Sequence, residues 1–211
     1  SKTYKVALQA MILEELDRVK YQGRILQCAQ FLVDNQTKNG MWAYGEPTVL
    51  PKDVPPPAAS TPSKRKPGLK DFGDPTERQK PKVTRLLPVK KMRDVGFGGD
   101  YSNSQYAALG LKACHDAGIV IPKEVIDQAL KAWQQDPHGE GRKAKDVKGW
   151  GYLFNPGAVD TGSMTAGGIG SIAIYRYMRK EPWMADPDIA SGLRWLGQNF
   201  SVARHPGHDN P

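Results

Sequence analysis

Residues 31–42 read FLVDNQTKNGMW: the end of an apolar helix is followed by a glutamine and then by Gly-x-Trp. The end of this pattern recurs as GWGY at residues 149–152. Each copy precedes a stretch rich in small residues, SQYAALGL at 104–111 and TAGGI at 165–169. A Gly/Trp turn that leads into a small-residue helix more than once indicates internal repetition, and repetition decides the fold.

The spacing of the helix starts supports a repeat. Thr3, Ser104 and Thr165 each open an apolar helix that contains small residues. Ser104 and Thr165 are 61 residues apart, whereas Thr3 and Ser104 are 101 residues apart. The longer step contains residues 46–94, which read as an insertion, and without them it shrinks to about 52 residues.

Two helices are expected in each repeat. Apolar residues between Ile25 and Val33 recur every three or four positions, which is one face of a helix, and Pro122 suits a helix start. No stretch shows sustained alternation typical of strands. The sequence therefore predicts an all-α chain of three helical hairpins, with helix pairs at residues 2–16 and 21–36, 103–117 and 123–135, and 163–178 and 188–200.

Composition sets the wider limits. With 39% hydrophobic residues, a chain of 211 residues supports one ordinary core, so we interpret residues 1–211 as a single domain or a fragment of one. No apolar run is long enough for a membrane span and no signal peptide is visible, so we expect a soluble protein of undetermined compartment. Cys28 and Cys114 lie in helix stripes, which favours buried free thiols over a disulfide.

The net charge of +8 is concentrated in the insertion. Residues 52–94 carry twelve Lys and Arg against five Asp and Glu, a net charge of +7, and nine prolines fall between Pro51 and Pro88. Such a segment cannot bury enough apolar surface to fold alone. An anionic partner such as nucleic acid is one interpretation. We favour a solvated loop that packs against its own domain or a neighbour, because the segment lacks the interleaved aromatic residues that base stacking uses. We also expect that the fold does not need this loop.

The pattern FLxxxQxxxGxW at residues 31–42 resembles the QW motif of the squalene cyclase and prenyltransferase superfamily, and the chain looks like its bacterial repeat proteins. In that motif a glutamine can bond to free backbone groups at a helix end while the tryptophan packs over it. The resemblance implies an α/α toroid whose inner and outer helices alternate around a cavity, with Thr3, Ser104 and Thr165 opening inner helices.

Three hairpins are fewer than a closed toroid needs, which is about five to six. We therefore expect part of a toroid, completed by more of the same chain, by self-association or by a partner chain. The start at Ser1, directly within a helix, favours a fragment.

The acidic motif of triterpene cyclases is not matched. The comparable stretch, VDTGSMTA at residues 159–166, keeps Thr165 and Ala166 but has Ser163 and Met164 where the resemblance requires acids. Asp160 and Asp100 remain as weak catalytic candidates, and we interpret Asp160 as a helix cap or turn residue.

The zinc site of protein prenyltransferases is not matched either. Cys114 and His115 are adjacent, and neighbouring side chains on a helix point about 100° apart, so they do not face one cavity. The tail HPGHD at residues 205–209 carries little weight as a chelator because polar termini seldom hold a metal. We expect no metal and no cofactor.

Aromatic residues gather at the turns before the expected inner helices. In one interpretation the tryptophans are packing wedges; in the other the set lines a concave mouth for an apolar isoprenoid or a glycan. The candidate ligand-binding residues are Trp42, Tyr44, Tyr101, Tyr106, Trp150, Tyr152 and Tyr175.

These observations favour a binding or assembly module without a recognisable catalytic motif. One alternative is an isoprenoid cyclase or prenyltransferase-type enzyme whose acid or metal site lies outside this chain. A second alternative is a glycan-active α/α toroid.

Overall fold

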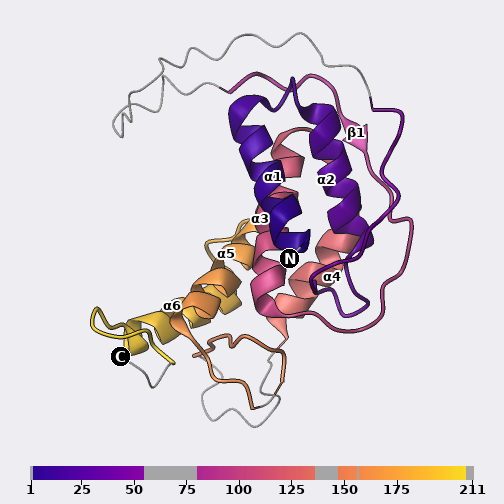
Figure 1. Ribbon diagram of the computed structural model, residues 1–211. Coiled ribbons are helices and arrows are strands. Elements are labelled where there is room, and N and C mark those ends of the chain that lie inside the picture. The colour runs from indigo at the N-terminus through magenta and orange to yellow at the C-terminus, as the bar shows by residue number, and fades with distance from the viewer. Residues whose placement is uncertain (1, 55–79, 136–146, 156, 208–211) are drawn as a thin grey trace.

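The computed structural model describes residues 2–54, 80–135, 147–155 and 157–207 (Figure 1). Each helix of this part lies within two residues of its predicted span, and the all-α class is confirmed. A two-residue parallel pair, β1 (Leu87–Pro88) with β2 (Ile119–Val120), is too short to change that class. The helices are α1 (Lys2–Asp17), α2 (Gln22–Asp34), α3 (Tyr101–Asp116), α4 (Lys123–Gln134), α5 (Gly162–Met178) and α6 (Pro187–Asn199).

Helices α1, α3 and α5 form a central layer in which α3 packs against both of the others (Figure 1). Helix α2 packs against α1 and α3, while α4 and α6 pack against α5. Small residues allow the close approach within the central layer. A Cβ atom at Gly110 of α3 would lie 2.8 Å from the Cα atom of Ala7 and 2.9 Å from the Cδ1 atom of Leu32. The small-residue stretch of α3 is therefore a packing surface for α1.

Trp42 joins the end of α2 to the start of α3. Its indole N–H donates to the carbonyl of Leu32, in the last turn of α2, at 2.8 Å. Its backbone N–H donates to the hydroxyl of Ser104, in the first turn of α3, at 3.0 Å. The carbonyl of Trp42 accepts from the backbone N–H of Asp100 at 3.0 Å, and the side chain is fully buried. One residue thus satisfies backbone groups at two helix ends.

Trp150 makes the same bonds one hairpin later. Its indole N–H donates to the carbonyl of Trp133, in the last turn of α4, and its backbone N–H to the hydroxyl of Thr165 in α5, both at 3.1 Å. Its ring is fully buried, and Cβ atoms at Gly168 and Gly192 would lie 2.6 Å and 2.9 Å from ring atoms. We call this arrangement, at Trp42 and at Trp150, the tryptophan joint.

Gln36, the glutamine of the sequence pattern, is fully buried. Its side-chain amide donates to the carbonyl of Val125 in α4 at 2.8 Å and to that of Gly40 at 3.4 Å. Gly40 has φ +83°, and a Cβ atom there would lie 2.2 Å from the carbonyl oxygen of Gln128. The prediction that this glutamine bonds to backbone groups is confirmed, and the main acceptor belongs to the following outer helix.

Residues 80–94, the described end of the insertion, run along α2 (Figure 1). The amide of Gln30 donates to the carbonyl of Lys90 at 2.7 Å, and the backbone N–H of Met92 donates to the carboxylate of Asp34 at 2.7 Å. Val89 is 6% exposed and belongs to the core. The expected packing against the domain is confirmed for these residues. These residues therefore contact side chains of α2, and the expectation that folding does not need the insertion stays a prediction.

Replacing Trp150 with Ala is expected to lower the free energy of unfolding by about 3–5 kcal/mol, since it removes a buried ring and the indole hydrogen bond to the carbonyl of Trp133. Chemical denaturation followed by circular dichroism measures the change. Trp183, which is 44% exposed, is the matched control, and its replacement with Ala should cost far less. Equal losses of unfolding free energy in the Trp150 and Trp183 variants would contradict the stabilising role of the tryptophan joint.

Replacing Arg93 with Ala is expected to lower the free energy of unfolding by about 1–3 kcal/mol, because it removes hydrogen bonds between residues 80–94 and the end of α2. The guanidinium donates to the carbonyls of Asp34, Pro47 and Glu46 at 3.2, 2.9 and 3.1 Å. Lys90→Ala, which removes an exposed basic side chain of the same segment, is the control for charge. An unchanged free energy of unfolding in the Arg93 variant would mean that residues 80–94 contact the surface without stabilising the fold.

Candidate functional site

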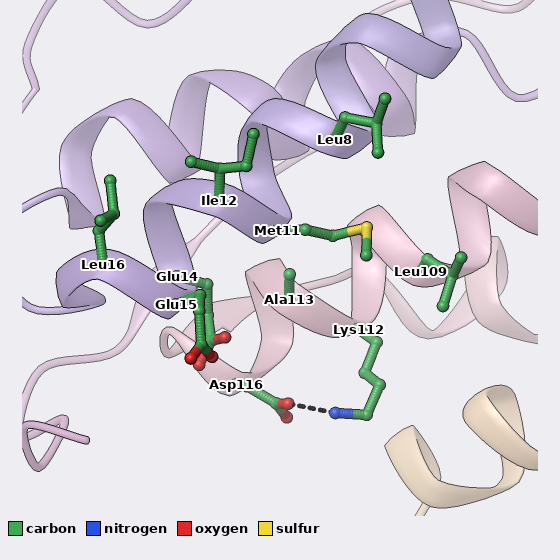
Figure 2. A pocket seen from close by; sticks show the side chains of 10 residues that line it. All are labelled: Leu8, Met11, Ile12, Glu14, Glu15, Leu16, Leu109, Lys112, Ala113 and Asp116. Carbon is green, nitrogen blue, oxygen red and sulfur yellow. Dashed lines mark hydrogen bonds and ion pairs between the residues drawn. The ribbon is translucent and has the colours of Figure 1, made fainter. Parts of the chain in front are cut away.

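An open groove with a volume of about 590 Å³ runs between α1 and α3 (Figure 2). Leu8, Ile12 and Leu16 recur every four residues along one face of α1 and are 43%, 58% and 53% exposed. A surface of this kind is unusual for a face that contacts only water. The apolar lining is Leu8, Met11, Ile12, Leu16, Leu109 and Ala113, and the polar lining is Glu14, Glu15, Lys112 and Asp116.

Each of the three carboxylates that line the groove has a basic partner. Glu14, which is 6% exposed, accepts from the ammonium of Lys80 at 2.6 Å, and the same ammonium lies 2.8 Å from Glu15. Asp116 pairs with Lys112 at 2.5 Å (Figure 2). The groove thus combines an apolar length with a charged end whose carboxylates are ion-paired.

The thiols and the histidine near the groove are not activated. Burial raises the pKa of Cys28 to about 11 and raises the pKa of Cys114 well above its ordinary value. Both cysteines are free and buried, as predicted. Burial lowers the pKa of His115, whose ring lies edge-on to Tyr177 at 5.8 Å. Protonated, buried thiols are poor nucleophiles and poor metal ligands.

The two carboxylates singled out from the sequence lie at helix starts. Asp100 is the N-cap of α3: its side chain accepts from the backbone N–H of Asn103 at 2.6 Å and from the amide of Asn103 at 2.8 Å. The N-cap of α5 is Thr161, not Asp160, so the interpretation of Asp160 as a cap is wrong by one residue. Asp160 lies instead against Gly149 and Gly207, where added Cβ atoms would meet its atoms at 2.7 and 2.0 Å.

The candidate ligand-binding aromatic residues fall into two groups, one accessible to solvent and one buried. Tyr44 and Tyr152 are 59% and 47% exposed, and Tyr106 is half-buried, so these three offer ring surface to a ligand. The buried members, whose rings are closed off by packing, are Trp42, Tyr101, Trp150 and Tyr175.

Tyr4 joins the accessible set, although the sequence patterns did not single it out. Its ring centroid lies 4.2 Å from that of Tyr106, and its hydroxyl bonds to that of Ser102. Tyr44 is among the groups that raise the pKa of Tyr152, so these two side chains lie close together. We call Tyr4, Tyr44, Tyr106 and Tyr152 the tyrosine cluster. The sequence signal that could have identified Tyr4 is its position directly after Thr3, at the start of α1.

The tyrosine cluster lies in a negative electrostatic potential. The carboxylate of Asp100 is the largest cause that raises the pKa of Tyr152 to about 12, followed by burial and by Tyr44 and Tyr4. Burial first, and then Asp100 among other groups, raises the pKa of Tyr4. The shift at Tyr152 means that a second negative charge is disfavoured near Asp100, whereas the shift at Tyr4 is mainly an effect of burial.

No family model, curated protein or solved structure matches the chain. Within the described ranges no three His, Cys, Asp or Glu side chains group in a way that could hold a metal ion. The same ranges contain no helix of the length and apolarity that crossing a membrane requires. The site has therefore to be interpreted from its own geometry.

Replacing Asp100 with Asn should lower the pKa of Tyr152 from about 12 toward its ordinary value of 10.0, because Asn keeps the N-cap but removes the charge. A phenol whose pKa is raised by folding stabilises the fold while it is neutral. Its contribution is complete below pH about 10 and is lost as the pH rises through about 12. Nuclear magnetic resonance of the tyrosine Cζ atoms measures the titration.

Asp53→Asn removes an exposed carboxylate elsewhere and is the control for that titration. An identical Tyr152 titration in wild type and in the Asp100 variant would exclude the assigned source of the potential.

Proposed function

We propose that this chain is a binding module built from helical-hairpin repeats, part of an α/α toroid like that of squalene cyclases and prenyltransferases. The two tryptophan joints support the repeat, because the same bonds recur between α2 and α3 and between α4 and α5. The alternation of central and flanking helices supports the toroid arrangement. In such an array the central layer faces the cavity, and its free face is the ligand-binding surface.

The groove between α1 and α3 is the proposed ligand-binding site. Its volume of about 590 Å³ falls within the usual size of small-ligand sites, and its lining is mainly aliphatic (Figure 2). An elongated apolar chain of the isoprenoid class fits a lining of this kind along α1. The charged end at Glu14, Lys112 and Asp116 would accommodate a polar head group such as a hydroxyl.

The carboxylates of the candidate sites favour a binding function over catalysis, because they already have ion-pair or hydrogen-bond partners. Protonation of an alkene needs a carboxylic acid whose proton faces the substrate. Glu14, Glu15 and Asp116 are ion-paired, and Asp100 caps a helix. The described part of the chain therefore supports a cyclase, a prenyltransferase or a glycan-active enzyme less well than a binding module.

Exposed apolar residues at the other end of the array favour a second function, assembly with a further chain. Met184, Leu193 and Phe200, on and beside α6, are 80%, 55% and 77% exposed. In a repeat array the last hairpin buries its outer face only when another unit follows. A second copy or a partner chain would supply that unit.

Replacing Ile12 with Asp should weaken binding of dansyl-labelled farnesol at least about tenfold, because the variant places a charge in the apolar lining of the groove. Fluorescence titration measures the affinity, and the melting temperature should change little since Ile12 is 58% exposed. Leu86→Asp, at a position 69% exposed and outside both proposed surfaces, is the matched control and should bind as wild type does. Equal affinity in the wild-type chain and the Ile12 variant, or no binding by the wild type, would refute the proposed ligand site.

A further inference from the structure

The tyrosine cluster is assembled from four separate segments and lies apart from the groove lining. Tyr4 is in the first turn of α1, and Tyr106 is in the second turn of α3. Tyr44 and Tyr152 each follow a tryptophan joint by two residues. Backbone bonds fix both loops: the N–H of Thr3 donates to the carbonyl of Tyr44 at 3.0 Å, and the N–H of Tyr101 donates to that of Tyr152 at 3.1 Å. The cluster is therefore positioned by the joints.

A buried carboxylate supplies negative charge near Tyr152 and Tyr4. Asp100 is 7% exposed and is held by Asn103. The potential that disfavours a phenolate at Tyr152 favours a cation at the same place. Ring faces add to this attraction because the quadrupole of an aromatic ring is negative over its face. Charge and ring surface thus select the same kind of ligand.

Elsewhere the chain places its own ammonium groups over aromatic rings. Lys112 lies 5.3 Å from the ring centroid of Tyr177, and Lys148 lies 4.8 Å from that of Trp150. At the tyrosine cluster the exposed rings of Tyr44 and Tyr152 leave space for a cation that comes from solution.

We propose that the tyrosine cluster binds an organic ammonium group, such as a quaternary or N-methylated amine, with Tyr44 and Tyr152 as accessible walls and Asp100 as the counter-charge. A diffuse, weakly hydrated cation suits ring faces, whereas a metal ion requires several open oxygen ligands. Both carboxylate oxygens of Asp100 already accept hydrogen bonds from Asn103, which favours the organic cation further.

The test compares choline with 3,3-dimethylbutan-1-ol, its neutral isostere, by isothermal titration calorimetry on the full chain. Wild type is expected to bind choline at least about fivefold more tightly than the isostere, because the two differ only in charge. The Asp100→Asn variant, which keeps the cap, should lose most of that difference. Tyr152→Phe should retain it, since the ring face remains, and Tyr152→Leu should lose it.

Circular dichroism establishes that each variant is folded before titration, and the two Tyr152 variants change an exposed side chain, so at least these are expected to fold. Equal affinity for choline and its isostere, or no choline binding at about 10 mM, would overturn the proposal. Preferential binding of a neutral oligosaccharide such as maltotriose would overturn it as well, and would assign the cluster to a glycan.

Discussion

The tryptophan joint is the constraint on which the rest of this structure depends. A helix ends with carbonyls that lack partners and begins with N–H groups that lack partners, and burying either without a hydrogen bond is costly. At Trp42 and at Trp150 one residue bonds to the last turn of a flanking helix, α2 or α4, through its indole and to the first turn of a central helix, α3 or α5, through its backbone. The joint therefore sets how each hairpin meets the next, and it leaves one face of α1 and α3 uncovered.

Helices α1 and α3 contribute to both proposed sites, the tyrosine cluster and the groove, which differ in chemistry. The starts of α1 and α3, held by the joints, carry Tyr4 and Tyr106. The later turns carry the groove, from Leu8 to Leu16 on α1 and from Leu109 to Asp116 on α3 (Figure 2). Both proposals, an apolar chain in the groove and an organic cation at the tyrosine cluster, thus arise from a single packing arrangement. Each can fail without the other.

Sequence reasoning predicted the helix spans, because helix periodicity and a repeated turn are strong local signals. It placed Ser104 and Thr165 at helix starts, but it did not predict that their hydroxyls accept from the backbone N–H groups of Trp42 and Trp150. Sequence reasoning could not separate the buried aromatic residues from the exposed ones. Tyr101 and Tyr106 are five residues apart on α3, so they point about 140° apart, and only the first is buried. It predicted that the insertion packs but not which contacts residues 80–94 make, since these contacts use backbone groups that every residue type has.

Hydrogen exchange of the tryptophan indole N–H groups, followed by nuclear magnetic resonance, tests the central claim most directly. The chain has five tryptophans, and the indoles of Trp42 and Trp150 donate to helix-end carbonyls at 2.8 and 3.1 Å. If the joints hold the layers together, these two indoles exchange only when the whole chain unfolds, and Trp183, which is 44% exposed, exchanges freely. Exchange of Trp42 and Trp150 as fast as that of Trp183 would contradict the account.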